Sequence, residues 1–153
     1  MTMRYVFKVD DAKRYAFPTH INDIVLDRAE ASTSEVLHVV ILPGHATPSH
    51  LHNDMEQVYH VLEGKGVLEV GTPAAEFTMT PGDVVRIPPC TLHQIKCSGE
   101  VPLRYLAVDC FLRGRPAAEP TWRSHVEAIC RDQGWKMEEV LAGRFAPQGA
   151  GTR

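Results

Sequence analysis

Short runs of apolar and polar residues alternate along the chain from Asp23 to Val108, and Gly and Pro separate them. Turn signals stand at Pro43-Gly44, Gly64, Gly71, Pro81-Gly82 and Pro88-Pro89. Strands that recur about every 8–12 residues, without helices between them, are typical of a barrel or sandwich. Closing the sheet into a barrel removes its unpaired edges. The pattern predicts eight strands: Ile24–Leu26, Glu35–Leu42, Gln57–Glu63, Gly66–Val70, Ala75–Thr78, Asp83–Ile87, His93–Lys96 and Leu103–Val108.

The pattern changes after Phe111, where a connector rich in Pro and Ala leads into a segment with helical spacing. Trp122, Val126 and Ile129 recur at helical intervals, and Gly134 is typical of a helix end. A shorter helix is expected at 136–141. The sequence therefore predicts one domain with a barrel over residues 1–112, a helical extension over 113–145 that packs on the barrel or a partner subunit, and a tail over 146–153.

Composition and charge narrow the class of protein. The chain has 153 residues, 44% of them hydrophobic and 23% charged, which suits one soluble domain. A net charge of −3 without a basic stripe argues against a nucleic-acid partner, and no apolar run is long enough to span a bilayer. The first residues lack the features of a signal peptide, and the four scattered cysteines form no CxxC pair. We expect a cytoplasmic protein with reduced thiols.

Three histidines form a candidate metal site. His50 and His52 are two residues apart, so in an extended chain they project to the same side. His93 stands at the start of a later predicted strand and supplies a third imidazole. Imidazole suits Zn, Fe, Cu and Ni alike, so the residues favour a transition metal without selecting one. The His-x-His pair alone is weak evidence, and the third histidine strengthens it.

The stretch from Gly44 to Cys97 resembles the two sequence motifs of the cupin superfamily. The first motif is matched by Gly44, His50, His52 and Gly64, and the second by Gly82, Pro88 and His93. The resemblance implies an all-β fold, a cupin or jelly-roll β-barrel (double-stranded β-helix), here with a short C-terminal helical extension. It also implies a divalent transition metal (Fe, Mn, Ni, Zn or Co) on His50, His52, His93 and a fourth ligand.

The fourth ligand is where this sequence departs from the family. Gln57 stands where the family has Glu, and Glu56 precedes it. Gln57, Tyr59 and Val61 share one face of their strand, and family barrels turn that face inward, so Gln57 is the favoured ligand and Glu56 the alternative. A neutral amide would leave more of the metal's charge uncancelled and strengthen it as a Lewis acid. Cys90 and Cys97 also replace the Gly and Asn of the second motif.

Two residues are candidates for contact with a substrate. Tyr59 lies on the inward face and offers a phenol, although packing is its alternative role. Arg86 is a candidate carboxylate clamp if it points inward and an ordinary solvated charge if it points outward. We expect His60 to face outward and His125 to be exposed on its helix.

These features favour a metal-dependent enzyme acting on a small polar organic molecule, such as a hydroxy- or keto-acid or a sugar derivative. The resemblance favours isomerase or lyase chemistry. An Fe(II)-dependent dioxygenase is one alternative, and a non-catalytic metal- or ligand-binding or sensory cupin is another. The resemblance further implies a homodimer.

Overall fold

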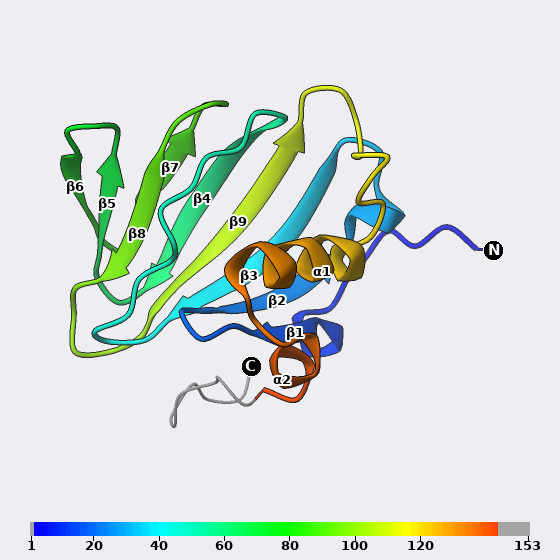
Figure 1. Ribbon diagram of the computed structural model, residues 1–153, viewed down its shortest axis with the longest axis horizontal. Coiled ribbons are helices and arrows are strands. Elements are labelled where there is room, and N and C mark those ends of the chain that lie inside the picture. The colour runs from blue at the N-terminus through cyan, green and yellow to red at the C-terminus, as the bar shows by residue number, and fades with distance from the viewer. Residues whose placement is uncertain (1, 144–153) are drawn as a thin grey trace.

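The computed structural model describes residues 2–143, which form two antiparallel sheets and two helices (Figure 1). The larger sheet has the strand order β1-β2-β3-β9-β4-β7 and the smaller one β6-β5-β8. The strands are β1 (Lys13–Ala16), β2 (Ile21–Leu26), β3 (Ser34–Ile41), β4 (Met55–Glu63), β5 (Gly66–Val70), β6 (Ala75–Met79), β7 (Val84–Ile87), β8 (His93–Cys97) and β9 (Leu103–Phe111). The helices are α1 (Trp122–Gln133) and α2 (Met137–Leu141), and two 3-10 turns span Val9–Asp11 and Arg28–Glu30.

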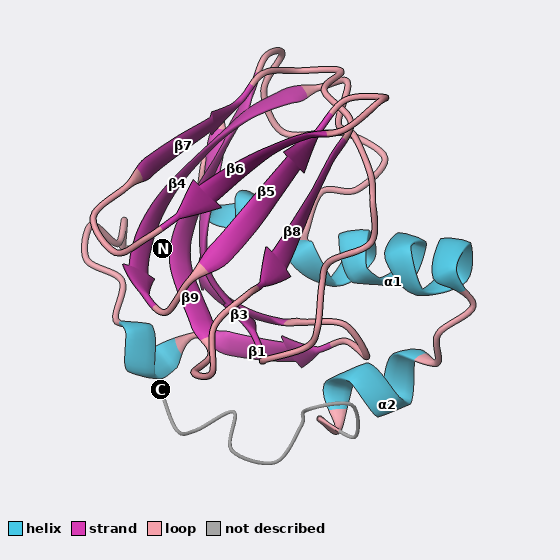
Figure 2. Ribbon diagram, turned by 90° about the vertical axis from the view of Figure 1, so that its left-hand side faces the viewer, coloured by secondary structure: helices cyan, strands magenta, loops and turns pink. Residues whose placement is uncertain are grey.

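The larger sheet is covered on its inner face by two different layers. The smaller sheet lies over the β4 and β7 side, and α1 lies across the β2 and β3 side (Figures 1 and 2). One continuous apolar core joins both layers, because Ile95 of β8 and Val126 of α1 belong to the same buried cluster as Tyr59 of β4. The expected all-β cupin-like barrel with short C-terminal helices is therefore confirmed.

Alternation of burial explains why these residues form strands. In β9 every second side chain, from Leu103 to Phe111, is buried, and the residues between them are partly exposed. In β4 the same period buries Met55, Gln57, Tyr59 and Val61 on the inner face. A period of two is the pattern of a strand with one face on a core.

The N-terminal part of the larger sheet was only partly predicted. The structure adds β1 and begins β2 at Ile21, three residues before the predicted start at Ile24. Lys13 and Arg14 are charged, so the sequence of β1 shows no clear apolar alternation. The strand pairs with β2 in an antiparallel ladder. Tyr15 and Ala16 are buried there. The strand is thus stabilised by pairing and burial rather than by its local sequence.

The predicted helices are present, and their ends have clear causes. The Thr121 hydroxyl accepts a hydrogen bond from the Ser124 amide, which forms a capping box, and Gly134 ends α1 in a left-handed conformation. Trp122, Val126 and Cys130 form the buried stripe of α1. The predicted tail over residues 146–153 lies outside the described residues, and the predicted homodimer stays a prediction.

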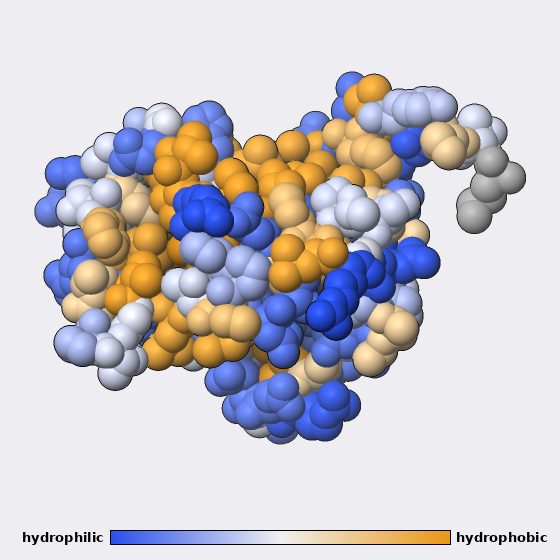
Figure 3. Space-filling model, turned by 90° about the horizontal axis from the view of Figure 1, so that it is seen from above, coloured by the Kyte–Doolittle hydropathy of each residue, from blue (hydrophilic) through white to orange (hydrophobic). Residues whose placement is uncertain are grey.

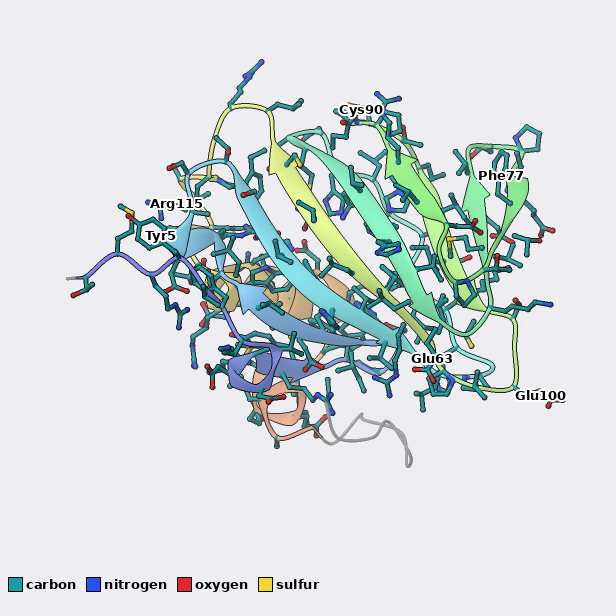
Figure 4. All side chains as sticks on the ribbon, turned by 180° about the vertical axis from the view of Figure 1, so that it is seen from behind. Tyr5, Glu63, Phe77, Cys90, Glu100 and Arg115 are labelled. Atoms are coloured by element: carbon teal, nitrogen blue, oxygen red, sulfur yellow. The ribbon has the colours of Figure 1, made fainter. Side chains whose placement is uncertain are left out.

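Two further observations bear on the sequence-based expectations. No helix within residues 2–143 has the length and apolar character that crossing a membrane requires. All four cysteines are free thiols, and Cys90 is the exposed one. Figure 4 shows Cys90 at the end of the barrel opposite Glu63 and Glu100.

Candidate functional site

The three predicted histidines meet at one place in the fold. His50 and His52 lie in the connection between β3 and β4, and His93 begins β8. The backbones of His50 and His93 exchange two hydrogen bonds, of 3.0 and 2.9 Å, in an isolated bridge. The ring centroids are 4.5 Å apart for His50 and His93, 4.9 Å for His50 and His52, and 6.2 Å for His52 and His93. The imidazoles therefore form one cluster.

Backbone carbonyls select the tautomer of two of these rings. The Nδ1 atom of His50 lies 2.7 Å from the Pro48 carbonyl oxygen, and that of His93 lies 2.8 Å from the Thr91 carbonyl oxygen. A carbonyl oxygen only accepts, so Nδ1 carries the hydrogen and Nε2 keeps its lone pair. The His93 Nε2 atom is buried and has no hydrogen-bond partner among the described residues. Metal-binding histidines use this arrangement, with the second nitrogen held by a carbonyl.

Burial keeps the cluster uncharged. Burial first, and the neighbouring imidazoles second, lower the pKa of His52 to about 3 and of His93 to about 4. Burial also lowers the pKa of His50. Neutral imidazole is the form that binds a metal ion, so the protonation state at neutral pH suits that role.

Gln57 of β4 lines a cavity next to the histidine cluster. Hydrogen bonds to two neighbours fix the orientation of its side-chain amide. Its nitrogen donates to the Asp109 Oδ1 atom at 2.8 Å, and its oxygen accepts from the Tyr59 hydroxyl at 2.8 Å. The amide group is therefore oriented, and the Tyr59 proton is committed to Gln57. Burial raises the pKa of Tyr59 well above its ordinary value, so the phenol stays protonated.

Behind Gln57 lies a buried network of charged groups. Asp109 of β9 sits directly opposite Gln57 on one side and opposite Glu35 on the other. Glu35 accepts two hydrogen bonds from Arg28, of 2.6 and 3.0 Å. Burial raises the pKa of both Glu35 and Asp109. One proton between the two carboxyl groups would leave the trio with Arg28 neutral, which is how buried charges are normally accommodated.

The alternatives Glu56 and Arg86 lie outside the cavity. Arg86 is exposed and its Nε atom contacts the Glu56 carboxylate at 2.8 Å on the outer face of β4 and β7. Strand alternation explains this placement, because neighbours of the buried Gln57 and Ile87 must point to the opposite face. Of the two orientations that the sequence left open for Arg86, the structure shows the outward one, so Arg86 is not placed to clamp a substrate in the cavity, and Gln57 rather than Glu56 lines it.

The chemistry of the donors fits a metal ion, although the donor atoms are not gathered around one point. Within residues 2–143, no group of three or more His, Cys, Asp or Glu side chains has the geometry to hold a metal ion. His50, His52 and His93 are nonetheless adjacent, neutral and held with lone pairs unused. The metal centre therefore stays a prediction.

A cavity of about 230 Å³ opens beside the cluster. This is below the ~300–1,000 Å³ of pockets for drug-sized ligands, so it suits a small molecule. Its wall comes from β2, β3, β4, β8, β9 and α1, and includes His50, His52, Gln57, Tyr59, Tyr105, Asp109, Trp122, His125 and Trp135. Viewed from the end of the barrel where β9 ends, hydrophobic residues reach the surface between more hydrophilic margins (Figure 3).

Three cavity residues were missed by the sequence analysis. Asp109 continues the buried alternation of β9, so extending the predicted strand beyond Val108 would have placed it inward. His125 lines the cavity instead of being exposed, because its ring packs edge-on against Trp122 at 5.0 Å. Asn22 is buried on a strand whose start was not predicted. His60 is exposed, as the strand pattern predicts.

Comparison with known proteins identifies the family. A family profile described as a cupin domain matches residues 37–109. An uncharacterized protein of Methanocaldococcus jannaschii is 32% identical over 87 residues, which cover 56% of this chain and 68% of that protein. The glucose-6-phosphate isomerase of Pyrococcus horikoshii is 37% identical over 67 residues, covering 40% of this chain but only 35% of that enzyme.

A solved structure shares the fold. The oxalate decarboxylase of Lactobacillus farciminis, in complex with formate, superimposes with a TM-score of 0.65 at 23% identity. The match covers 92% of this chain and 44% of that one. His50, His52 and His93 all lie within residues 37–109, the segment that the family profile matches. The chain belongs to the cupin family.

Proposed function

We propose that this protein is a metal-dependent cupin enzyme that acts on a small polar organic molecule by isomerase or lyase chemistry. One observation carries the proposal: neutral imidazoles of His50, His52 and His93, two of them tied by Nδ1 to backbone carbonyls, cluster beside a small cavity. Such a set of unused Nε2 lone pairs is suited to a divalent transition metal. Gln57 would supply an amide oxygen as the fourth donor.

A metal held there would polarise a carbonyl oxygen of the substrate and stabilise negative charge that develops on it. The chain's own residues contribute orientation and exclusion of water. Asp109 and Tyr59 hold the Gln57 amide from both ends, at 2.8 Å each. Aromatic and aliphatic side chains line the remaining wall and strengthen electrostatic interactions inside the cavity.

One group of relatives supports isomerase chemistry. This chain is 37% identical to a glucose-6-phosphate isomerase over 67 residues, although it spans only about a third of that enzyme. Isomerisation of a hydroxy-carbonyl compound needs a polarised carbonyl and a proton-carrying group, and the cavity offers candidates for both. The substrate class is therefore a hydroxy- or keto-acid or a sugar derivative.

The test is turnover with and without the metal. The protein, purified without a chelator, is incubated in D₂O with D-fructose or D-mannose, and proton NMR follows deuterium incorporation next to the carbonyl. We expect incorporation that EDTA abolishes and that added Mn²⁺, Co²⁺, Ni²⁺ or Zn²⁺ restores. Incorporation that is unaffected by EDTA would contradict the proposal. Substrate-dependent oxygen uptake in its place would indicate the dioxygenase alternative.

A further inference from the structure

Two buried polar atoms in the cavity wall have no partner within the described residues. They are the Oδ1 atom of Asn22, an acceptor, and the Nε1 atom of Trp122, a donor. Asn22 is 6% exposed and Trp122 is 3% exposed. Buried polar groups are nearly always hydrogen bonded, and an exception in a native structure calls for a ligand, an ion or a water molecule. The unused atoms indicate that the wall is built to bind something polar.

Both residues line the cavity and neighbour Tyr15. Asn22 of β2 lies opposite Tyr15 of β1 in the ladder, so the two side chains share a face. The Trp122 ring stacks on the Tyr15 ring at 6.2 Å. Asp27 fixes the start of α1 by accepting a hydrogen bond from the Trp122 amide at 3.0 Å. A donor and an acceptor thus flank Tyr15.

His125 adds a third polar group next to Trp122. Its Nδ1 atom lies 2.6 Å from the Glu119 carboxylate, and its ring contacts the Trp122 ring edge-on. Glu119 is held in turn by Arg28, whose Nη1 atom lies 3.6 Å from its carboxylate. A carboxylate accepts, so the His125 Nδ1 carries a hydrogen and Nε2 is the atom left for the cavity. Asn22, Trp122 and His125 are called the second polar pole below.

The charges around the cavity exclude one class of ligand. No Lys or Arg occurs among the described residues that line it, whereas Asp109 and Asp132 do line it. The buried Arg28 contacts Glu35 at 2.6 Å and does not line the cavity. At the α1 end, away from the proposed metal, a phosphate group would find no Lys or Arg in the wall, and Asp132 of α1 places a carboxyl group there. A hydroxyl group, by contrast, both donates and accepts, as Asn22 and Trp122 require.

We propose that the C-terminal extension builds a second polar pole that binds a hydroxyl-bearing end of the ligand, so that the substrate is a non-phosphorylated polyhydroxy compound rather than a sugar phosphate. This inference rests on the proposed function for the other end of the cavity. It assigns a ligand contact to Trp122 and His125, which lie outside the segment 37–109 matched by the family profile. Glu119 is a positioning residue for His125.

The two tryptophans of the chain make the cavity observable. Trp122 and Trp135 are the only two in the sequence, and both line it. Tryptophan fluorescence of the full chain is titrated with D-glucose and with D-glucose 6-phosphate, a pair that differs only in the phosphate. We expect saturable binding of D-glucose and no saturation with the phosphate ester. Tighter binding of D-glucose 6-phosphate, or no binding of D-glucose at its highest soluble concentration, would overturn the inference.

Variants then test the pole itself. Asn22→Ala, Trp122→Phe and His125→Gln each remove one hydrogen-bonding group, and each is expected to weaken D-glucose binding about three- to tenfold. Trp122→Phe keeps an aromatic ring and leaves Trp135 as the reporter. Glu119→Gln should weaken binding less than His125→Gln, because it only loosens the imidazole. The exposed His60→Gln is the matched control and should bind like the wild type.

These binding experiments test the second polar pole independently of the proposed metal-dependent activity. Unchanged binding in Asn22→Ala, Trp122→Phe and His125→Gln, with each variant folded by circular dichroism, would refute the second polar pole even if the protein is a metal enzyme. Loss of binding in these variants would support the pole even if EDTA has no effect on deuterium incorporation. Metal content is expected to be the same in all three variants as in the wild type.

Discussion

Gln57 and Asp109 face each other across β4 and β9, and the Gln57 amide nitrogen donates to the Asp109 carboxylate at 2.8 Å. This contact connects the candidate site to the buried charges of the barrel. Asp109 is 4% exposed and Glu35 is fully buried. The orientation of the predicted amide ligand therefore depends on a carboxyl group that is itself held by its neighbours. The substitutions below test these contacts one at a time.

Replacing Asp109 should destabilise the fold because its partners stay buried. In Asp109→Leu, the Gln57 amide nitrogen loses its acceptor and Arg28 loses part of its compensating charge, so we expect the free energy of unfolding to fall by about 3–5 kcal/mol. Asp109→Asn keeps an oxygen that accepts from Gln57 and should lower it by less. Urea unfolding of both variants provides the measurement. Equal losses in the two would contradict the role given to the Gln57 contact.

Stability should depend on pH through Glu35. Burial, with Asp109 beside it, raises the pKa of Glu35 from 4.5 to about 8. A raised pKa in the folded protein means that the contribution of this group is fully present below pH 4.5 and is lost as pH rises toward 8. The free energy of unfolding should therefore decline across this window, and it should decline less in Glu35→Gln. Parallel curves for the two proteins would show that Glu35 does not titrate there.

Cys90 occupies a backbone conformation that favours glycine. Its φ angle is 60°, and it is the non-glycine residue with positive φ among residues 2–143. Its amide also donates to the His52 carbonyl at 2.6 Å, so the turn is fixed beside the site. We expect Cys90→Gly to raise the free energy of unfolding by up to about 1 kcal/mol and the β-branched Cys90→Val to lower it. Thermal unfolding in a reducing buffer checks both signs. A stabilising Cys90→Val would contradict this account.

The sequence predicted most of the barrel because long stretches of its strands alternate and many of its turns contain Gly or Pro. Seven of the nine strands, β3 to β9, were placed within a few residues of their bounds. The pair β1 and β2 was harder, since Lys13 and Arg14 carry charge and Asn22 and Asp23 are buried polar residues. Arg14 and Asp23 pair with each other at 2.8 Å, and Tyr15 stacks on the distant Trp122, contacts that local periodicity does not encode.

The site was predicted in part for a similar reason. The histidines are marked by their spacing within short motifs. Strand parity placed Gln57 inward but left the orientation of Arg86 open. Asp109 and His125 come from segments that lie far along the chain from the motif and reach the cavity only through β9 pairing and the docking of α1. Strand period alone could have placed Asp109 inward, whereas His125 carries no such signal until the docking of α1 is known.

The central claim is that His50, His52 and His93 together hold a divalent metal ion. Its most direct test is the metal content, measured by inductively coupled plasma mass spectrometry, of wild type, His52→Ala, His93→Ala and the exposed control His60→Ala. All four proteins are purified without a chelator or a histidine tag. We predict a near-stoichiometric transition metal in the wild type and in His60→Ala, and its loss in the other two while circular dichroism shows them folded. Full metal content in folded His52→Ala and His93→Ala would contradict the claim.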